Sequence, residues 1–304
     1  MRVIATRLLE DLQEEVSGVE FSFWDAGHDE DLPRSILESC EVYIPTYMSR
    51  SQPFAILPEL SNLRLLQLLT AGVDTVLPLV PPGVALANAK GVHDASTAEL
   101  AVALMLASLR GFPSFIRSSQ TGAWHPLVTN SLADRRILIL GYGSVGIAIE
   151  RRLLPFEVTI DRVARRPREG VFGLEDLATL VPQVDIVVAA TPLTSETHHL
   201  INDDFLSSMR DGSLLVNVAR GPVVDTDALT NHLAAQRLSA ALDVTDPEPL
   251  PPNHPLWTLP NCLITPHVGG ATSAFTPRIK ALVADNLQRY VVGEPLRNVV
   301  TSSY

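Results

Sequence analysis

Short apolar runs alternate with helix-like patterns along most of this 304-residue chain. The runs predict strands at residues 2–5, 41–44, 63–68 and 84–87, and then at 136–140, 157–163, 185–189, 213–217, 238–243 and 262–265. Strands that are apolar on both faces and separated by helices are typical of parallel sheets covered on both sides. The pattern therefore predicts an α/β protein built from doubly wound parallel sheets.

Helical patterns divide the chain into two predicted domains. Residues 96–110 are apolar nearly all round, and Ser96 with Glu99 three positions on resembles a capping box. Such a helix is expected to be buried inside a domain or in a subunit interface. A last helix follows Thr272, ends near Gly293, and is expected to pack back on the first domain. We therefore expect one domain at 1–94 plus 272–304 and another at 95–271.

Composition narrows the class of partner. The chain is 46% hydrophobic and 19% charged, as in a globular protein, and its formal net charge is −11. An acidic chain is poorly suited to a nucleic-acid backbone or an anionic membrane, although a local arginine can still bind a small anion. No segment resembles a signal peptide or a membrane span, so a cytoplasmic location is expected. Cys40 and Cys262 form no C-x-x-C pair, so neither a disulfide framework nor a metal site is predicted.

Residues 141–146 read Gly-Tyr-Gly-Ser-Val-Gly, directly after a strand and at the start of a helix. This context is the one that a dinucleotide-binding loop requires. Gly141 permits a tight turn, Gly143 lets the backbone approach a pyrophosphate at the helix N-terminus, and Gly146 allows close contact between helix and strand. The alternative is an ordinary glycine-rich turn.

The next strand lacks the acid that NAD enzymes place about 20 residues further on, where it binds the ribose hydroxyls. Ala164 stands at that place and is followed by Arg165, Arg166 and, after a proline, Arg168, whereas Asp161 lies earlier, inside the predicted strand. Guanidinium groups suit the additional phosphate of NADP. We therefore expect NADP ahead of NAD as the cofactor, with a solvated basic loop as the alternative.

Three polar clusters follow predicted strands later in the chain, at the edge where open α/β sheets place their sites. They are Val216-Asn-Val-Ala-Arg-Gly-Pro222, the segment from Ala241 to Pro249, and Pro260 to Gly270, which contains Thr-Pro-His. With these motifs the chain strongly resembles the D-isomer-specific 2-hydroxyacid dehydrogenases, from the Thr70–Asp74 loop to the tail at Asn298. The resemblance implies a flavodoxin-like substrate domain, a Rossmann cofactor domain, and hydride transfer between a nicotinamide and a small 2-hydroxy acid or 2-oxo acid.

The resemblance assigns three catalytic roles. Arg220 matches the arginine that holds the substrate carboxylate and carbonyl oxygen, for which a guanidinium offers paired donors. His267 matches the acid/base, since reduction needs a proton at the carbonyl oxygen as the hydride arrives. Glu248 matches the carboxylate that pairs with this histidine and favours its charged form. Without the flanking motifs, each would be read as a structural or solvated residue.

Other matches are to binding. Ala71, Gly72 and Val73 match the loop whose backbone donors hold the substrate carboxylate. Asp243 matches an acid that contacts the nicotinamide carboxamide. Further cofactor contacts are expected, in addition to the three glycines and two arginines, at Ser144, Val145, Thr97, Thr191 and Ala219. His198 and His199 are given no role, and a structural role is expected for His93.

The family resemblance leaves two questions open. Some members of the superfamily are dinucleotide-sensing corepressors, so a binding protein is the alternative to an enzyme, while formate enzymes of this fold carry Gln where Glu248 stands here. Specificity is expected to depend on Tyr47–Arg50, Thr70–Asp74 and Trp257, and glyoxylate or hydroxypyruvate is the expected substrate. The resemblance also implies a homodimer, built partly on the helix at 96–110.

Overall fold

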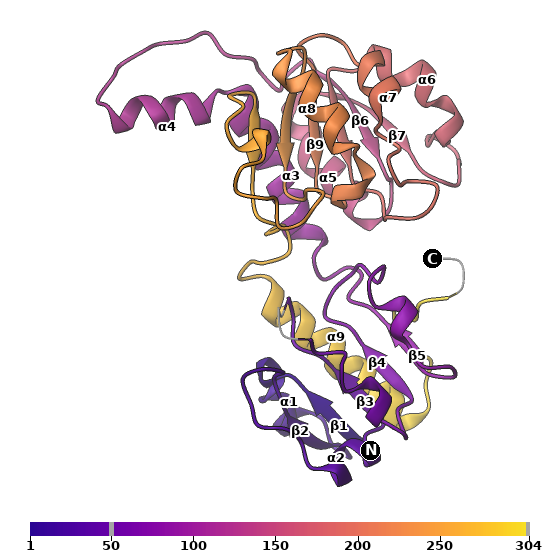
Figure 1. Ribbon diagram of the computed structural model, residues 1–304. Coiled ribbons are helices and arrows are strands. Elements are labelled where there is room, and N and C mark those ends of the chain that lie inside the picture. Colours follow the sequence, from indigo (N-terminus) through magenta and orange to yellow (C-terminus); the bar gives the residue numbers. More distant parts are fainter. Residues whose placement is uncertain (49–51, 302–304) are drawn as a thin grey trace. The chain divides into compact units, whose positions relative to one another are not determined.

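The structure is a computed structural model that describes residues 1–48 and 52–301. The chain divides into two compact units, one formed by Met1–His93 with Ser273–Tyr304 and the other by Asp94–Thr272. The two positions at which the chain passes from one unit to the other each lie one residue from the boundary expected from sequence. Each unit contains one parallel sheet flanked by helices, which confirms the predicted α/β class (Figure 1).

Unit 1 contains a five-stranded parallel sheet in the order β2-β1-β3-β4-β5. This is the flavodoxin-like order, in which the chain reverses direction across the sheet between β1 and β3. The strands are β1 Arg2–Ala5, β2 Glu20–Phe23, β3 Val42–Ile44, β4 Leu65–Gln67 and β5 Ala85–Ala87, and the helices are α1 Leu12–Glu15, α2 Arg34–Ser39 and α9 Phe275–Val292.

Unit 2 contains a six-stranded parallel sheet in the order β11-β10-β9-β8-β6-β7, so the chain reverses between β6 and β8. Its strands are β6 Arg136–Leu140, β7 Thr159–Val163, β8 Ile186–Ala189, β9 Leu214–Asn217, β10 Ser239–Leu242 and β11 Cys262–Ile264. Its helices are α3 Asp94–Leu109, α4 Phe112–Gln120, α5 Ser144–Leu153, α6 Leu177–Leu180, α7 Asp203–Ser208 and α8 Thr226–Ala234.

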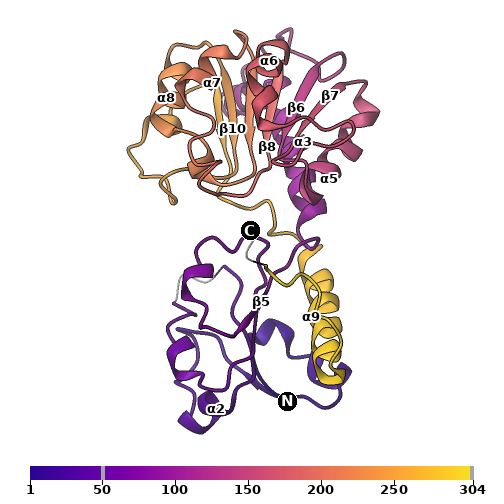
Figure 2. The ribbon, with the colours of Figure 1, turned by 90° about the vertical axis from the view of Figure 1, so that its right-hand side faces the viewer.

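The strands of unit 2 are apolar on both faces because helices cover both sides of the sheet. Along β6, Ile137 and Ile139 join a core with α3 and α5, whereas Leu138 and Leu140 join a second core with α6, α7 and α8 (Figure 2). Each fully buried side chain of this size contributes about 1.5–3 kcal/mol of transfer free energy. Because successive side chains point to opposite faces, the strand is a continuous apolar run, which is the pattern that predicted it.

The terminal helix α9 packs on unit 1, as expected from sequence. Its residues Phe275, Ile279, Val283 and Leu287 are buried in one core with strands β1, β3 and β4. The helix ends at Gly293, which adopts a left-handed conformation with φ 73°. That conformation favours glycine, so the sequence signal for the helix end has a direct structural cause.

The sequence-based expectations missed one strand and misplaced the start of one helix. The edge strand β2, Glu20–Phe23, was not predicted, because it is short and half-exposed and so lacks a buried apolar run. Helix α3 begins at Asp94, so Ser96 lies inside its first turn instead of capping it. The Ser96 hydroxyl is hydrogen-bonded to that of Thr272 at 2.7 Å, and Glu99 accepts from Arg152 at 3.2 Å.

The apolar character of α3 is explained by burial inside unit 2. Ala98, Ala101, Leu104 and Met105 are buried in the core that contains α5 and one face of the sheet. Over residues 1–48 and 52–301, no single helix is long and apolar enough to span a membrane. Helices α3 and α4 reach the required length only together, across a bend of 66°.

Candidate active site

The glycine loop of unit 2 joins β6 to α5. Gly141 has φ +105°, and its backbone N–H and that of Tyr142 donate to the Val163 carbonyl at 2.9 and 3.0 Å. A Cβ atom at Gly141 would lie 2.5 Å from the backbone of Ala190 and Thr191, and one at Gly146 would lie 2.3 Å from the Gly141 carbonyl oxygen. These two glycines are therefore required by close backbone packing.

Gly143 differs from its two neighbours in the loop. It precedes the first turn of α5, and a Cβ atom there would meet nothing within 4 Å. The space beside it is open at the positive end of a ten-residue helix, next to the point where the sheet reverses between β6 and β8. This arrangement fits the pyrophosphate of a dinucleotide, because backbone N–H groups and the helix dipole both favour an anion.

The strand after the glycine loop, β7, ends at Val163, so Ala164 occupies the place where an acid would bind ribose. Asp161 cannot take that role, since it is buried inside the strand and accepts a hydrogen bond from Arg136 at 2.7 Å. Arg165 and Arg166 follow Ala164 on an exposed loop. The positive charge expected from sequence is therefore at the strand end.

Three adjacent strands end level with one another and carry the three expected catalytic residues. Asn217 of β9 and Ile264 of β11 both pair with Leu242 of β10, at the carboxyl ends of these strands. Arg220 follows β9, Glu248 follows β10 and His267 follows β11. Because parallel strands direct their carboxyl ends to one edge, the sequence brings these side chains to the same edge of the unit 2 sheet.

His267 and Glu248 form a hydrogen-bonded pair. Nδ1 of the imidazole lies 2.6 Å from Oε1 of the carboxylate, and the two side chains are 34% and 43% exposed. The contact fixes the ring orientation and leaves Nε2, on the far side of the ring, as the atom that can exchange a proton with a ligand. This is the geometry of a histidine acid/base with an orienting carboxylate.

Asp243 supports the loop that carries His267. Its buried carboxylate accepts from the Thr265 hydroxyl at 2.6 Å and from the backbone N–H groups of Val268 and Gly269 at 2.9 Å each. Its backbone carbonyl accepts from the N–H of His267 at 2.7 Å, which stabilises that residue in a left-handed conformation with φ 54°. The structure thus gives Asp243 a positioning role that the sequence did not reveal.

Arg220 is held at the end of β9 by a compact turn. The buried Asn217 side chain donates to the Arg220 carbonyl and accepts from the Ala219 N–H, both at 3.0 Å. The guanidinium donates to the Ala219 carbonyl at 2.8 Å. A Cβ atom at Gly221 would lie 1.9 Å from the Thr245 carbonyl oxygen, so only glycine allows this turn to pack against the segment that leads to Glu248.

Asn217, Gly221 and Gly269 are supporting residues to which sequence reasoning gave no role, although each lies within a motif that it quoted. At Gly269 a Cβ atom would lie 2.9 Å from Asp243 Oδ2 and 3.5 Å from the Thr97 side chain. This places Thr97, at the start of α3, beside the His267 loop. Thr191 follows β8 beside Gly141, while Ser144 and Val145 form the first turn of α5.

The expected substrate loop lies in unit 1, after β4. Asn88 is buried, and its side chain donates to the Ala71 carbonyl at 2.8 Å, while the Thr70 hydroxyl donates to the Gly72 carbonyl at 2.9 Å. Val73 is buried and anchors the loop in the unit 1 core. These contacts hold the loop in place within its own unit.

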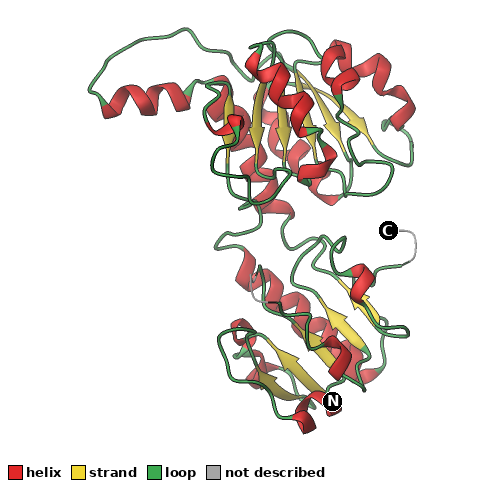
Figure 3. Ribbon diagram, viewed as in Figure 1, coloured by secondary structure: helices red, strands yellow, loops and turns green. Residues whose placement is uncertain are grey.

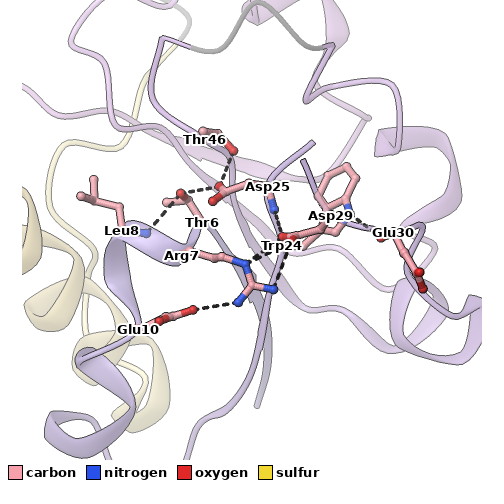
Figure 4. A network of polar contacts seen from close by, with 9 residues as sticks. All are labelled: Thr6, Arg7, Leu8, Glu10, Trp24, Asp25, Asp29, Glu30 and Thr46. Carbon is pink, nitrogen blue, oxygen red and sulfur yellow. Dashed lines mark hydrogen bonds and ion pairs between the residues drawn. The ribbon is translucent and has the colours of Figure 1, made fainter. Parts of the chain in front are cut away.

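A second polar network in unit 1 joins the ends of β1, β2 and β3 (Figure 4). The Asp25 carboxylate accepts from the hydroxyls of Thr6 at 2.6 Å and Thr46 at 2.7 Å, and Asp29 accepts from Arg7 through two nitrogens. Thr46 directly precedes the loop at 47–50 that the sequence assigned to substrate specificity. Of that loop, Ser49 and Arg50 lie outside the described residues.

The remaining histidine and aromatic residues are placed as follows. The Tyr47 ring stacks on Phe275 at 4.2 Å and on His93 at 5.6 Å between centroids, and His93 Nε2 lies 2.9 Å from the Leu69 carbonyl oxygen. These contacts agree with a structural role for His93. Trp257 is about half exposed and donates to the Pro251 carbonyl at 2.9 Å.

Comparison with known proteins identifies the family. The family model described as "D-isomer specific 2-hydroxyacid dehydrogenase, NAD binding domain" matches residues 102–269, which lie within unit 2. Human glyoxylate reductase/hydroxypyruvate reductase is 37% identical over 250 residues, covering 78% of this chain and 76% of the human protein. The chain belongs to the D-isomer-specific 2-hydroxyacid dehydrogenase family, as its motifs predicted, and is an NAD(P)-dependent oxidoreductase.

Solved structures agree with the family assignment. A D-isomer specific 2-hydroxyacid dehydrogenase from Xanthobacter autotrophicus in complex with NADPH has a TM-score of 0.83 and 28% identity, covering 100% of this chain and 99% of that one. An NAD-dependent formate dehydrogenase from Staphylococcus aureus in complex with NAD has a TM-score of 0.80 and 28% identity, covering 99% of each chain. Proteins similar to this chain therefore bind either nicotinamide cofactor.

Proposed function

We propose that this chain reduces a small 2-oxo acid, glyoxylate or hydroxypyruvate, to the corresponding 2-hydroxy acid, which for hydroxypyruvate is the D-isomer. The observation that carries the proposal is the His267–Glu248 pair, with Nδ1 and Oε1 2.6 Å apart, on an edge that Arg220 shares. The human relative named for these two reductions supports the choice of substrate. Unit 1 acts as the substrate domain, and the loop at Ala71–Val73 binds the substrate carboxylate with its backbone N–H groups.

The proposed mechanism separates binding from proton transfer. Arg220 holds the carboxylate and the carbonyl oxygen, which orients the carbon and stabilises negative charge as it develops on that oxygen. His267 gives its Nε2 proton to the same oxygen, and Glu248 stabilises the charged ring before the transfer. The bound nicotinamide supplies the hydride. In the oxidative direction neutral His267 accepts the hydroxyl proton, so oxidation favours a higher pH than reduction.

The cofactor site follows from the unit 2 loops. Backbone N–H groups at Gly143, Ser144 and Val145 would hold the pyrophosphate, while Thr97, Thr191, Ala219 and Asp243 would bind the remainder of the cofactor. Asp243 retains one role in the His267 loop and takes another toward the nicotinamide carboxamide. A steady-state assay with glyoxylate, hydroxypyruvate and pyruvate tests the activity. A protein that binds NADPH but turns over none of them would instead be the dinucleotide-sensing alternative.

We further propose that NADPH is preferred over NADH, because Ala164 stands where an acid would repel a 2′-phosphate, and Arg165 and Arg166 follow it directly. Arg165→Ala is expected to raise the KM for NADPH about tenfold and that for NADH less than about twofold, since only NADPH carries the 2′-phosphate to which this guanidinium would donate. Initial rates with each cofactor measure this.

Arg151→Ala is the matched control, because Arg151 is an exposed arginine near the opposite end of α5 from the glycine loop. Its KM values should match those of the unmutated protein. Equal efficiency of the unmutated protein with both cofactors would contradict the proposed preference.

We propose a homodimer whose contact is formed by α4 and the loop after it. The sequence led us to expect this contact at α3, but that helix is buried inside unit 2. Helix α4 and the loop that follows extend away from the body of unit 2 (Figure 3). They carry exposed apolar side chains at Phe112, Ile116, Trp124, Leu127 and Val128. Phe112 and Ile116 are four residues apart and therefore share one helix face. Both side chains are more than half exposed, so the described part of unit 2 leaves this apolar face largely open to solvent.

Combining Ile116→Asp with Trp124→Ser is expected to convert the dimer into a monomer at micromolar concentration, because both changes place polar groups in a contact that must exclude water. Sedimentation velocity measures the assembly. Leu77→Ser, at an exposed leucine of unit 1, should leave the dimer intact. A monomer in the unmutated protein would refute the assembly.

We also propose a cytoplasmic location, which the free thiols of Cys40 and Cys262 support.

A further inference from the structure

Tyr142, the residue between the first two glycines of the loop, belongs to a network that no step of the proposed mechanism uses. Its hydroxyl donates to Glu150 on α5, and Glu150 accepts from Arg162 on β7 at 2.9 Å. The Arg162 guanidinium also lies 5.7 Å from the centre of the Tyr142 ring. Glu150 is only 7% exposed, so the network connects the glycine loop to both elements that follow it.

The charges in this network are compensated internally. The hydrogen bond from Arg162 lowers the pKa of Glu150, with the Tyr142 hydroxyl adding to the effect, so the buried carboxylate stays ionised. Burial and the hydrogen bond to Glu150 raise the pKa of Tyr142, so its hydroxyl remains a donor. The charge of Arg162 is therefore paired with that of Glu150, and the hydrogen bond from Tyr142 to Glu150 holds the tyrosine ring in one orientation.

Arg168 contacts the same tyrosine from the arginine loop, residues 164–172. Its guanidinium lies 5.6 Å from the ring centre and donates to the Tyr142 carbonyl at 2.9 Å. Its other terminal nitrogen lies 3.4 Å from the Arg166 carbonyl oxygen. All three contacts are to neutral groups, so they leave the charge of this exposed side chain uncompensated, in contrast to that of Arg162.

The arginine loop is closed at its base as well. The Ala164 N–H donates to the Phe172 carbonyl at 3.0 Å, and the Phe172 N–H donates to the Arg162 carbonyl at 2.8 Å. Arg168 and Val171 exchange backbone hydrogen bonds at 3.0 and 2.8 Å, which forms the tight turn at Glu169 and Gly170. Arg165 and Arg166 thus lie on a short segment between the base of the loop and the contact of Arg168 with Tyr142.

We infer that Tyr142 is a positioning residue for NADPH: by holding Arg168, it fixes the arginine loop beside the glycine loop so that its guanidinium groups face the 2′-phosphate. This inference rests on the proposed preference for NADPH. It assigns a specificity role to a side chain that itself contacts no phosphate. The pyrophosphate is common to NADH and NADPH, so a network that served the pyrophosphate would affect both cofactors equally.

The test is calorimetric titration of NADPH and NADH into the full chain. Tyr142→Leu removes the ring platform, and Arg168→Ala removes the group that it holds. Each is expected to weaken NADPH binding about three- to tenfold and to leave NADH binding within about twofold. The double variant should be no weaker than either single one, because both changes break one contact. Tyr142→Phe retains the ring and should lie close to the unmutated protein.

The outcomes separate this inference from the cofactor proposal. Equal affinity of the unmutated protein for both cofactors overturns both. A preference for NADPH that Arg165→Ala removes but Tyr142→Leu and Arg168→Ala leave unchanged overturns only the role of Tyr142, and so do additive effects in the double variant. If circular dichroism shows that Tyr142→Leu does not fold, Arg168→Lys provides the test. This variant retains the positive charge but loses the guanidinium contacts with the Tyr142 ring and carbonyl. The inference is overturned if Arg168→Lys binds NADPH as tightly as the unmutated protein does.

Discussion

Replacing His267 with alanine is expected to lower kcat for 2-oxo acid reduction by about 10²- to 10⁴-fold, because the carbonyl oxygen loses its proton donor. Affinity for NADPH, measured by fluorescence titration, should stay within about twofold of that of the unmutated protein. The glycine loop follows β6 and the arginine loop follows β7, whereas His267 follows β11. His198→Ala is the matched control, because His198 stacks on His199 and has no role in the site. A His267→Ala variant that retains most of its turnover would show that another group delivers the proton.

The contact between Glu248 and His267 is tested by Glu248→Gln in the same assay. This variant retains a hydrogen-bonding side chain of the same size but removes the carboxylate that lies 2.6 Å from Nδ1 of the ring. We expect kcat for reduction to fall, by less than in His267→Ala, while affinity for NADPH is retained. An unchanged kcat would show that the carboxylate has no role in proton transfer.

Replacing Arg220 with alanine is expected to lower kcat/KM for 2-oxo acid reduction by about 10³-fold, with kcat and KM both affected. The guanidinium binds the substrate carboxylate in the ground state and the developing oxyanion in the transition state, so its loss harms both. Arg220→Lys should recover only a small part, because an ammonium group lacks the paired donor geometry. Steady-state kinetics with hydroxypyruvate measures all three proteins.

The control for Arg220 is Arg210→Ala. Arg210 precedes β9, whereas Arg220 follows it, so the two arginines stand at opposite ends of one strand. Arg210 is about half exposed and interacts with Asp185. Its removal should leave kcat/KM within about twofold. A loss at Arg220 no larger than that at Arg210 would contradict the assigned role.

The buried strands were predictable because each is a continuous apolar run. In β6 and β8, alternate side chains enter two different cores, and this burial on both faces is visible in sequence. The edge strand β2 carries no such signal, since it is half-exposed. The cap of α3 was mispredicted because Ser96 uses its hydroxyl for a distant partner, Thr272, which no local pattern can reveal.

Motifs indicate the candidate catalytic residues, whereas the contacts that support these residues depend on packing between distant segments. The motifs point to Arg220, Glu248 and His267, and the level ends of β9, β10 and β11 explain why these three residues share one edge. The requirement for glycine at 221 depends on how closely Thr245 approaches, which only the fold shows. The role of the Asp243 carboxylate in the His267 loop likewise depends on contacts between residues more than 20 positions apart.

The account's central claim is hydride transfer to the carbonyl carbon of a 2-oxo acid, and isotope transfer tests it most directly. The purified chain is incubated with hydroxypyruvate and NADPH deuterated at both C4 positions, and the products are analysed by mass spectrometry. We predict glycerate that carries one deuterium at C2, formed by the unmutated protein and almost absent with His267→Ala. NADPH binding without deuterium in the product of any 2-oxo acid would contradict the account and identify a dinucleotide-binding protein instead.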